Sequence, residues 1–214
     1  GEEEGLLGSL GMLGQLTEDD LSRRMRSGSA GPTLRELLTG IGVDPASVSS
    51  GKHCVDFAKI AAFIEVHIEQ SARLDNAVTD RVGVVTGIRG LIRHRTIQAI
   101  GETAHAGAVD FPYRKDAALA CARFSSRLYD FWQHELSLGR DLVATTGVIR
   151  ASPSASMNKI AGECIVSLDA RSLSAAELNL FEKKVEAILQ ETAEETGVIF
   201  KTDPLMRIAP VEAD

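Results

Sequence analysis

The sequence predicts a mixed α/β (α+β) fold whose second half is a ferredoxin-like βαββαβ unit running from about Gly90 to about Leu205. Four strand-like segments and two amphipathic helices support this prediction, because they follow the order strand, helix, strand, strand, helix, strand. The chain of 214 residues suits one large or two small domains, and its 44% hydrophobic residues permit a sizeable core.

The first part of the chain predicts short helices followed by two strands. Thr17 is a plausible N-cap for a helix in "TEDDLSRRM", and "TLRELLTGIG" predicts a second helix that stops near Gly40. A further short helix is expected around Asp56 to Ala61. Strands are expected from Phe63 to Gln70 and in "RVGVVTGIRG".

The βαββαβ unit begins with a strand in "IRHRTIQAIGE". In the long helix that follows, apolar side chains recur at helical spacing on one face. The next strands are expected in "LVATTGVIRAS" and "GECIVSLDARS". The apolar face of the helix consists of Cys121, Phe124, Leu128, Phe131 and Trp132.

The second helix of the unit has clear signals at both ends. Ser174 and Glu177 form a capping-box pattern, and Gly197 suits the C-terminal stop. "VIFKTD" predicts the last strand, and no closing element is expected in "RIAPVEAD". Because both ends of the sequence are abrupt, we expect an internal piece of a longer chain. The apolar stripe of the helix consists of Leu178, Phe181, Val185 and Ile188.

Composition argues against several classes of protein. The net charge of −7 gives no basic footprint for nucleic acid, and no apolar run approaches the roughly 18 residues of a membrane span. The acidic start differs from the basic start of a secretory signal. Three widely spaced cysteines, Cys54, Cys121 and Cys164, fit neither a disulfide framework nor a CxxC metal clip, so a reducing, cytoplasmic setting is expected.

Two segments contain candidate metal ligands. "GEEEG" is either a solvated acidic run or a pair in which one carboxylate binds a metal and its neighbour takes a proton from water. In the strand expected around "HIEQS", His67 shares a face with Glu65 and Glu69. It is either a hydrogen-bonded strand residue or a metal ligand.

Two further segments contain candidate substrate contacts. His105 lies among small residues before a Pro-containing loop, and is either a turn histidine or a residue that a substrate can approach. Asn158 precedes a strand that Arg171 ends. These two polar groups either bind a ligand at the strand ends or form a turn and an ordinary ion pair between Asp169 and Arg171.

The motifs "EEEG", "VHIEQ", "HAGAVDFPYRKDA" and "MNKIAGECIVSLDAR", in this order and over nearly the whole chain, resemble one family. It is the metal-dependent amidohydrolases of the aminoacylase/metallopeptidase-like superfamily, and the similarity is greatest to N-carbamoyl-L-amino-acid hydrolases and allantoate amidohydrolases. The resemblance implies hydrolysis of a carbamoyl or ureido C–N bond in a small carboxylated substrate, two divalent metals (Zn or Mn) per active site, and a homodimer.

The resemblance also implies an organisation of the chain. Residues 1–89 would be part of the catalytic metallohydrolase domain, 90–205 a lid and dimerisation domain, and 206–214 the start of the return to the catalytic domain. The resemblance implies that Glu3 is the general base, that Glu4 and His67 are metal ligands, and that Gln70 lies near the substrate. His105 would contact the substrate carbonyl across a dimer. Asn158 and Arg171 would bind the substrate, with Arg171 on its carboxylate.

Several positions depart from the family pattern. Gly5-Leu6-Leu7-Gly8 replaces Gly-Ser-Arg-Phe, and Ser71 and Ala161 replace a glycine and a proline. Ala108, Asp110 and Phe111 also differ from the usual residues after His-Ala-Gly. The remaining metal ligands of the family would lie outside this chain, so the piece alone is expected to be inactive. The alternatives are a non-catalytic dimerisation or lid module, and an aminoacylase- or dipeptidase-type metallopeptidase.

Overall fold

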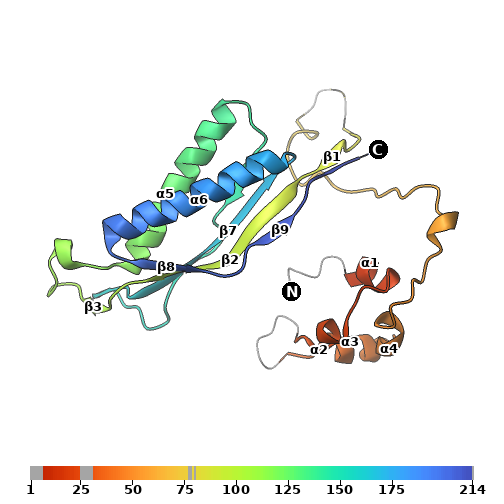
Figure 1. Cartoon of the computed structure of the whole chain (residues 1–214), viewed down its shortest axis with the longest axis horizontal. Helices are drawn as coiled ribbons and strands as arrows, with labels where there is room; N and C mark the ends of the chain where they lie inside the picture. Colours follow the sequence, from red (N-terminus) through yellow and green to blue (C-terminus); the bar gives the residue numbers. More distant parts are fainter. Residues whose placement is uncertain (1–6, 25–30, 77–78, 80, 214) are drawn as a thin grey trace. The chain divides into compact units, whose positions relative to one another are not determined.

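The computed structural model describes residues 7–24, 31–76, 79 and 81–213 (Figure 1). The chain divides into two compact units, Gly1–Arg73 and Leu74–Asp214. The described residues of the first unit form four short α-helices and one 3₁₀ helix. These are α1 (Leu7–Met12), α2 (Glu18–Ser22), α3 (Leu34–Gly40), α4 (Pro45–Val48) and η3 (Phe57–Lys59).

Capping side chains define the helix starts of the first unit. Thr17 accepts a hydrogen bond from the Asp20 N–H, and a matching capping box joins Thr33 to Glu36, so the predicted N-cap at Thr17 is confirmed. The predicted stop of α3 at Gly40 is also confirmed. Helices of five to seven residues are not stable alone, so contacts between them must contribute.

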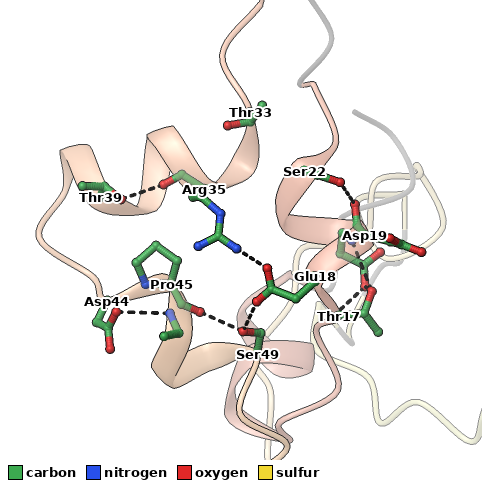
Figure 2. Close-up of polar contacts among 12 residues, drawn as sticks. Thr17, Glu18, Asp19, Ser22, Thr33, Arg35, Thr39, Asp44, Pro45 and Ser49 are labelled. Atoms are coloured by element: carbon green, nitrogen blue, oxygen red, sulfur yellow. Dashed lines mark hydrogen bonds and ion pairs between the residues drawn. The ribbon is translucent and has the colours of Figure 1, made fainter.

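One such contact is centred on Glu18, which lies between two other elements (Figure 2). Its carboxylate accepts a hydrogen bond from the Ser49 hydroxyl at 2.8 Å and forms an ion pair with Arg35 of α3. The Ser49 hydrogen bond, followed by the charge and hydrogen bond of Arg35, lowers the pKa of Glu18. Glu18 therefore links α2, α3 and the end of α4.

The strand predicted from Phe63 to Gln70 is wrong, because this segment forms no strand and none of the described strands lies beside it. Its apolar side chains are almost fully exposed, and Val66 reaches 97%. Of the strand predicted in "RVGVVTGIRG", only Gly87–Ile88 (β1) forms before β2 begins. A strand needs a partner for its backbone groups, and within the described residues neither segment has one over most of its length.

The second unit is built on an antiparallel sheet with strand order β4-β7-β2-β8. The two long central strands are β2 (Gly90–Ile100) and β7 (Glu163–Ser172). The short strands β5 and β9 pair with β7 and β2, respectively. The other bounds are Val143–Thr145 for β4, Ile149–Ala151 for β5, Ile199–Thr202 for β8 and Met206–Ile208 for β9.

The helices α5 (Ala117–Ser137) and α6 (Ala175–Thr196) lie on the same side of this sheet (Figure 1). Alternate residues of β7 face them and are buried, including Val166, Leu168 and Ala170. The apolar stripe predicted for α6 is buried in the same core, whereas Phe131 and Trp132 of α5 are half-buried at its margin. The mixed α/β fold with antiparallel sheets is therefore confirmed.

The N-terminus of α6 differs in one detail from the predicted capping box. The Ser174 hydroxyl accepts from the Glu177 N–H at 3.3 Å, as expected. The Glu177 carboxylate, however, accepts from the Ser172 hydroxyl at 2.7 Å, and this hydroxyl accepts from the Ser174 N–H at 2.9 Å. The Ser172 hydroxyl, at the end of β7, therefore links the Glu177 carboxylate to the Ser174 N–H, which do not bond directly. At the other end, Gly197 adopts the left-handed conformation with φ 64° and ends the helix as predicted.

The expectation of no closing element after the βαββαβ order is wrong. Strand β9 continues along β2 beyond β8, and β10 (Val211–Glu212) pairs with β1. These pairings hold the last described residues against the start of the second unit. Within the part of the chain that the structure describes, no helix is long and apolar enough to cross a membrane.

Candidate active site

The predicted base Glu3 and metal ligand Glu4 lie outside the described residues. The predicted ligand His67 and its neighbour Gln70 lie on the exposed segment after η3. The His67 Nδ1 donates to the Ile68 carbonyl at 2.5 Å, so the proton is on Nδ1 and a neutral ring keeps the Nε2 lone pair for a ligand. Gln70 has φ 58°, a left-handed backbone conformation that is uncommon for a residue other than glycine.

The described residues do not build a metal centre by themselves. No group of three or more His, Cys, Asp or Glu side chains in this part of the chain is arranged to hold an ion. His67 is the single described member of the predicted ligand set, and one imidazole is too few for a divalent ion that takes four or more ligands. The donors present in the described segments therefore do not fit a complete metal site.

The structure brings His105 and Asn158 together at one end of the second unit. Strand β3 (Ala104–His105) pairs with β6 (Lys159–Ile160), and His105 lies opposite Lys159. The Ala106 N–H donates to the Asn158 carbonyl at 2.9 Å. His105 and Asn158, which are 53 positions apart in sequence, therefore lie at one short antiparallel strand pair, the His105–Asn158 edge. Both of their side chains are exposed.

The hydrogen bonds of these two side chains engage one acceptor atom of each and leave a donor group on each. The His105 Nδ1 accepts from the Gly107 N–H at 3.1 Å, which places the proton of a neutral ring on Nε2. The Asn158 Oδ1 accepts from the Ser156 hydroxyl at 2.8 Å, which leaves the amide N–H₂ group as donor. An imidazole N–H and an amide N–H₂ on one exposed edge suit a carbonyl oxygen.

Arg114, which the sequence analysis did not single out, fixes the loop that follows His105. Its Nε donates to the Val109 carbonyl at 2.8 Å and its Nη2 to the Ala106 carbonyl at 2.5 Å. Two residues later, Asp116 caps α5 by accepting from the Ala118 and Leu119 N–H groups at 3.0 and 3.1 Å. Arg114 therefore holds the loop closed, and Asp116, two residues later, caps the start of the helix.

Arg171 lies near the end of β7, and its neighbour Asp169 accepts from its Nε at 2.7 Å. The ion pair considered above as the ordinary interpretation is therefore present. Asp169 also pairs with Arg93 of β2, which the sequence analysis did not identify. Partial burial acts to raise the pKa of Asp169, but the hydrogen bonds and charges of Arg171 and Arg93 outweigh it and lower the pKa.

Arg171 and the His105–Asn158 edge lie at opposite ends of β7. The strand begins at Glu163, close to the β3–β6 pair, and Arg171 is opposite Leu91 near the β1 end (Figure 1). Eight residue steps at about 3.3 Å each separate Glu163 from Arg171 by about 26 Å. A small substrate cannot contact both ends within one chain.

Two hollows in the second unit are lined by neither His105, Asn158 nor Arg171. One of about 240 Å³ lies between α6 and the sheet and is lined in part by His94 and Asp203, whose Nδ1 and Oδ1 atoms are 3.1 Å apart. The other, of about 710 Å³, lies along the Phe111–Asp116 turn and the end of α6. His105 and Asn158 therefore lie on an exposed strand pair, and Arg171 lies on a strand that is paired on both sides, with its side chain half exposed.

Comparison with known proteins gives homologues over nearly the whole chain. No family model matches. The chain is 30% identical over 215 residues to an N-carbamoyl-L-amino-acid amidohydrolase of Paenarthrobacter aurescens, covering 99% of this chain and 50% of that protein. It is 32% identical over 155 residues to an allantoate amidohydrolase of Bacillus subtilis, covering 72% and 36%, respectively.

Solved structures agree with these relatives. A hydantoinase/carbamoylase family amidase from Burkholderia vietnamiensis superposes with a TM-score of 0.74 at 27% identity, over 98% of this chain and 47% of the other. The chain spans about half the length, or less, of the curated relatives that it matches.

Proposed function

We propose that this chain is part of a hydrolase that cleaves a carbamoyl or ureido C–N bond. Its homologues include N-carbamoyl-L-amino-acid and allantoate amidohydrolases, and its structural neighbours include hydantoinase/carbamoylase family amidases. The named substrates of the relatives, N-carbamoyl-L-amino acids and allantoate, combine a ureido group with a carboxylate. We assign the same class to the complete protein. Attack of water on the ureido carbon would break one of its C–N bonds, release the leaving nitrogen as an amine or ammonia, and leave the carboxylate unchanged.

The observation that best supports this proposal is the division of polar groups between the two ends of β7. At one end, His105 Nε2 and the Asn158 amide offer donors for a carbonyl oxygen. At the other, Arg171 offers a guanidinium for a carboxylate. These donors suit the two groups that the substrate class combines, but about 26 Å of strand separates them in one chain.

The separation favours a site shared between two chains. We propose that residues 90–205 form a ferredoxin-like lid and dimerisation domain, and that His105 and Asn158 of one subunit reach the active site of the other. The strand order β4-β7-β2-β8 and the two helices on one face fit that fold. In this arrangement Arg171 would bind the carboxylate while the partner's edge holds the ureido carbonyl.

We assign the remaining roles to the first 89 residues, as part of the catalytic domain, with residues 206–214 returning to it. Glu3 would take the proton of the attacking water and pass it to the leaving nitrogen, and Gln70 would lie near the substrate. Two divalent ions, zinc or manganese, would polarise the carbonyl and lower the pKa of the water when bound. From this chain Glu4 and His67 would be ligands, which is too few for two ions, so the chain alone should lack turnover.

Subunit mixing tests the shared site in the full-length protein. His105→Ala and Glu3→Gln variants should each be inactive toward N-carbamoyl amino acids. An equal mixture of the two, after subunit exchange, should regain about a quarter of wild-type activity, since about half of the dimers are then mixed and each mixed dimer has one intact site. No recovery in verified mixed dimers would contradict the shared site. A dimeric full-length protein that turns over no ureido substrate would instead favour a non-catalytic lid module.

A further inference from the structure

Arg93, Asp169 and Arg171 form a connected group on the face of the sheet away from the helices. Asp169 and Arg171 alternate along β7 with the buried Leu168 and Ala170, which places both on the open face. Arg93 is the Cα partner of Asp169 on β2. The Asp169 carboxylate therefore lies between one guanidinium from its own strand and one from the neighbouring strand.

Each oxygen of Asp169 has a separate arginine partner. Oδ1 accepts from the Arg171 Nε at 2.7 Å, whereas Oδ2 accepts from both the Nε and the Nη2 of Arg93, at 2.8 and 2.5 Å. Arg93 and Asp169 are mostly covered, with side-chain exposures of 22% and 23%. With both oxygens engaged, the carboxylate is fixed in orientation, and Arg93 determines that orientation from across the strand pair.

The same bonds define which edge of Arg171 remains for a ligand. A guanidinium has five N–H donors, and a carboxylate can bind bidentately to the Nε–Nη side or to the Nη1–Nη2 end. The Nε of Arg171 donates to Asp169, and neither Nη atom of Arg171 has a hydrogen-bond partner among the described residues. The Arg171 side chain is 50% exposed, so its Nη1–Nη2 end can meet a ligand in solvent.

We infer that Asp169 and Arg93 are positioning residues that aim the Nη1–Nη2 end of Arg171 at the substrate carboxylate. This inference rests on the proposed function, in which Arg171 binds that carboxylate. Two guanidinium groups around one carboxylate leave a single positive charge, which matches a ligand group with one negative charge. Arg93 thus contributes to selection of carboxylated substrates without contacting them.

Double-mutant kinetics on the full-length protein test the inference with an N-carbamoyl amino acid and its carboxamide, which lacks the charge. Asp169→Asn and Arg93→Met should each raise KM for the acid about tenfold, as expected for loss of one charge-assisted interaction, with kcat changed less than about threefold. Neither should affect KM for the carboxamide. In an Arg171→Met background neither should have a further effect, because both act through Arg171.

Arg150→Met is the matched control, since Arg150 is an exposed arginine on β5 of the same sheet, and its KM should equal that of the wild type. An equal rise in KM with and without Arg171, or an unchanged KM in both single variants, would overturn the inference.

An Arg171→Met variant with unchanged KM would overturn the proposed anchor instead. The NMR signal of the Arg171 Nε–H then decides the positioning alone. Faster solvent exchange of this proton in Asp169→Asn than in the wild type supports the positioning of Arg171 by Asp169, and unchanged exchange overturns it.

Discussion

A methyl group added at Gly101 is expected to disrupt the crossing of three backbone segments that supports the His105–Asn158 edge. The Gly101 N–H donates to the Gly162 carbonyl at 2.8 Å, and the Glu102 N–H donates to the Lys115 carbonyl at 2.9 Å. A Cβ at Gly101 would lie 1.9 Å from the Lys115 carbonyl oxygen and 2.8 Å from its carbon. The obstructing atoms belong to the backbone, so no side-chain rotation can relieve the contact.

The cost of Gly101→Ala follows from this geometry. Real Cβ atoms essentially never approach other heavy atoms more closely than 3.0 Å, so the Lys115 carbonyl must move by at least 1.1 Å, the difference between 3.0 and 1.9 Å. Forcing extra volume into a packed site costs about 1–3 kcal/mol, and weakening the hydrogen bond to Glu102 adds about 1 kcal/mol. The free energy of unfolding should fall by about 2–4 kcal/mol, which corresponds to a Tm decrease of about 10 °C for a unit of this size.

Urea denaturation followed by circular dichroism measures this change, and Gly147→Ala provides the control. A Cβ at Gly147 would meet the Thr145 Cγ2 at 3.8 Å, an ordinary contact, so the control should stay within about 0.5 kcal/mol of the wild type. Amide hydrogen exchange should show faster exchange at Glu102 in Gly101→Ala. A Gly101→Ala variant as stable as Gly147→Ala, with unchanged exchange at Glu102, would refute the argument.

Three further predictions concern single side chains. Asp116→Ala removes the cap of α5 and should lower the free energy of unfolding by about 1 kcal/mol in urea denaturation, whereas Asp116→Asn should retain most of it. The lowered pKa of Asp169 means that its contribution to stability is complete above the unfolded-state pKa of about 3.9 and is lost as the pH falls through the folded-state value. The urea midpoints of the wild type and Asp169→Asn should therefore differ at pH 6 and converge as the pH falls below the ordinary range of a carboxyl group, and a constant difference would contradict this assignment. Finally, Val66→Lys, which places a charge in the exposed apolar segment, should slow aggregation of the isolated chain in light scattering, and Arg73→Lys should not.

The elements with their own internal periodicity could be predicted from the sequence. The stripe of Leu178, Phe181, Val185 and Ile188 repeats at helical spacing, and all four side chains are buried against the sheet. The alternation in "ECIVSLDARS" likewise defines a strand with one buried face. In both cases the residues that determine the structure are neighbours in sequence, which is why the pattern is sufficient.

Elements that depend on a distant partner could not be predicted in the same way. The alternation around His67 is as regular as that of β7, but in the described residues this segment has no neighbouring strand and stays extended and exposed. Strand β9 has only three residues and forms because β2 continues past the end of β8. A periodic pattern indicates which face of a strand is apolar, but it does not identify the partner strand that must lie beside it.

The same limit applies to the candidate site. His105, Asn158 and Arg171 could be proposed as candidates from local motifs, because each lies beside a turn or a strand end. Arg93 lies 76 residues from Asp169 and becomes its partner through the register of β2 with β7. Arg114 bonds to backbone carbonyls, which have no signature in the sequence.

The register of β7 also limits how this chain can change in length. Because strand side chains alternate between faces, deletion of one residue between Cys164 and Leu168 would turn Asp169 and Arg171 toward α5 and α6 and bring their charges into the apolar core. The same deletion would shorten the distance between the two ends of the strand by one residue step. Among homologous sequences, insertions and deletions should therefore collect in the turn of residues 152–157 and the loop after His105, while the number of residues from Glu163 to Arg171 stays constant.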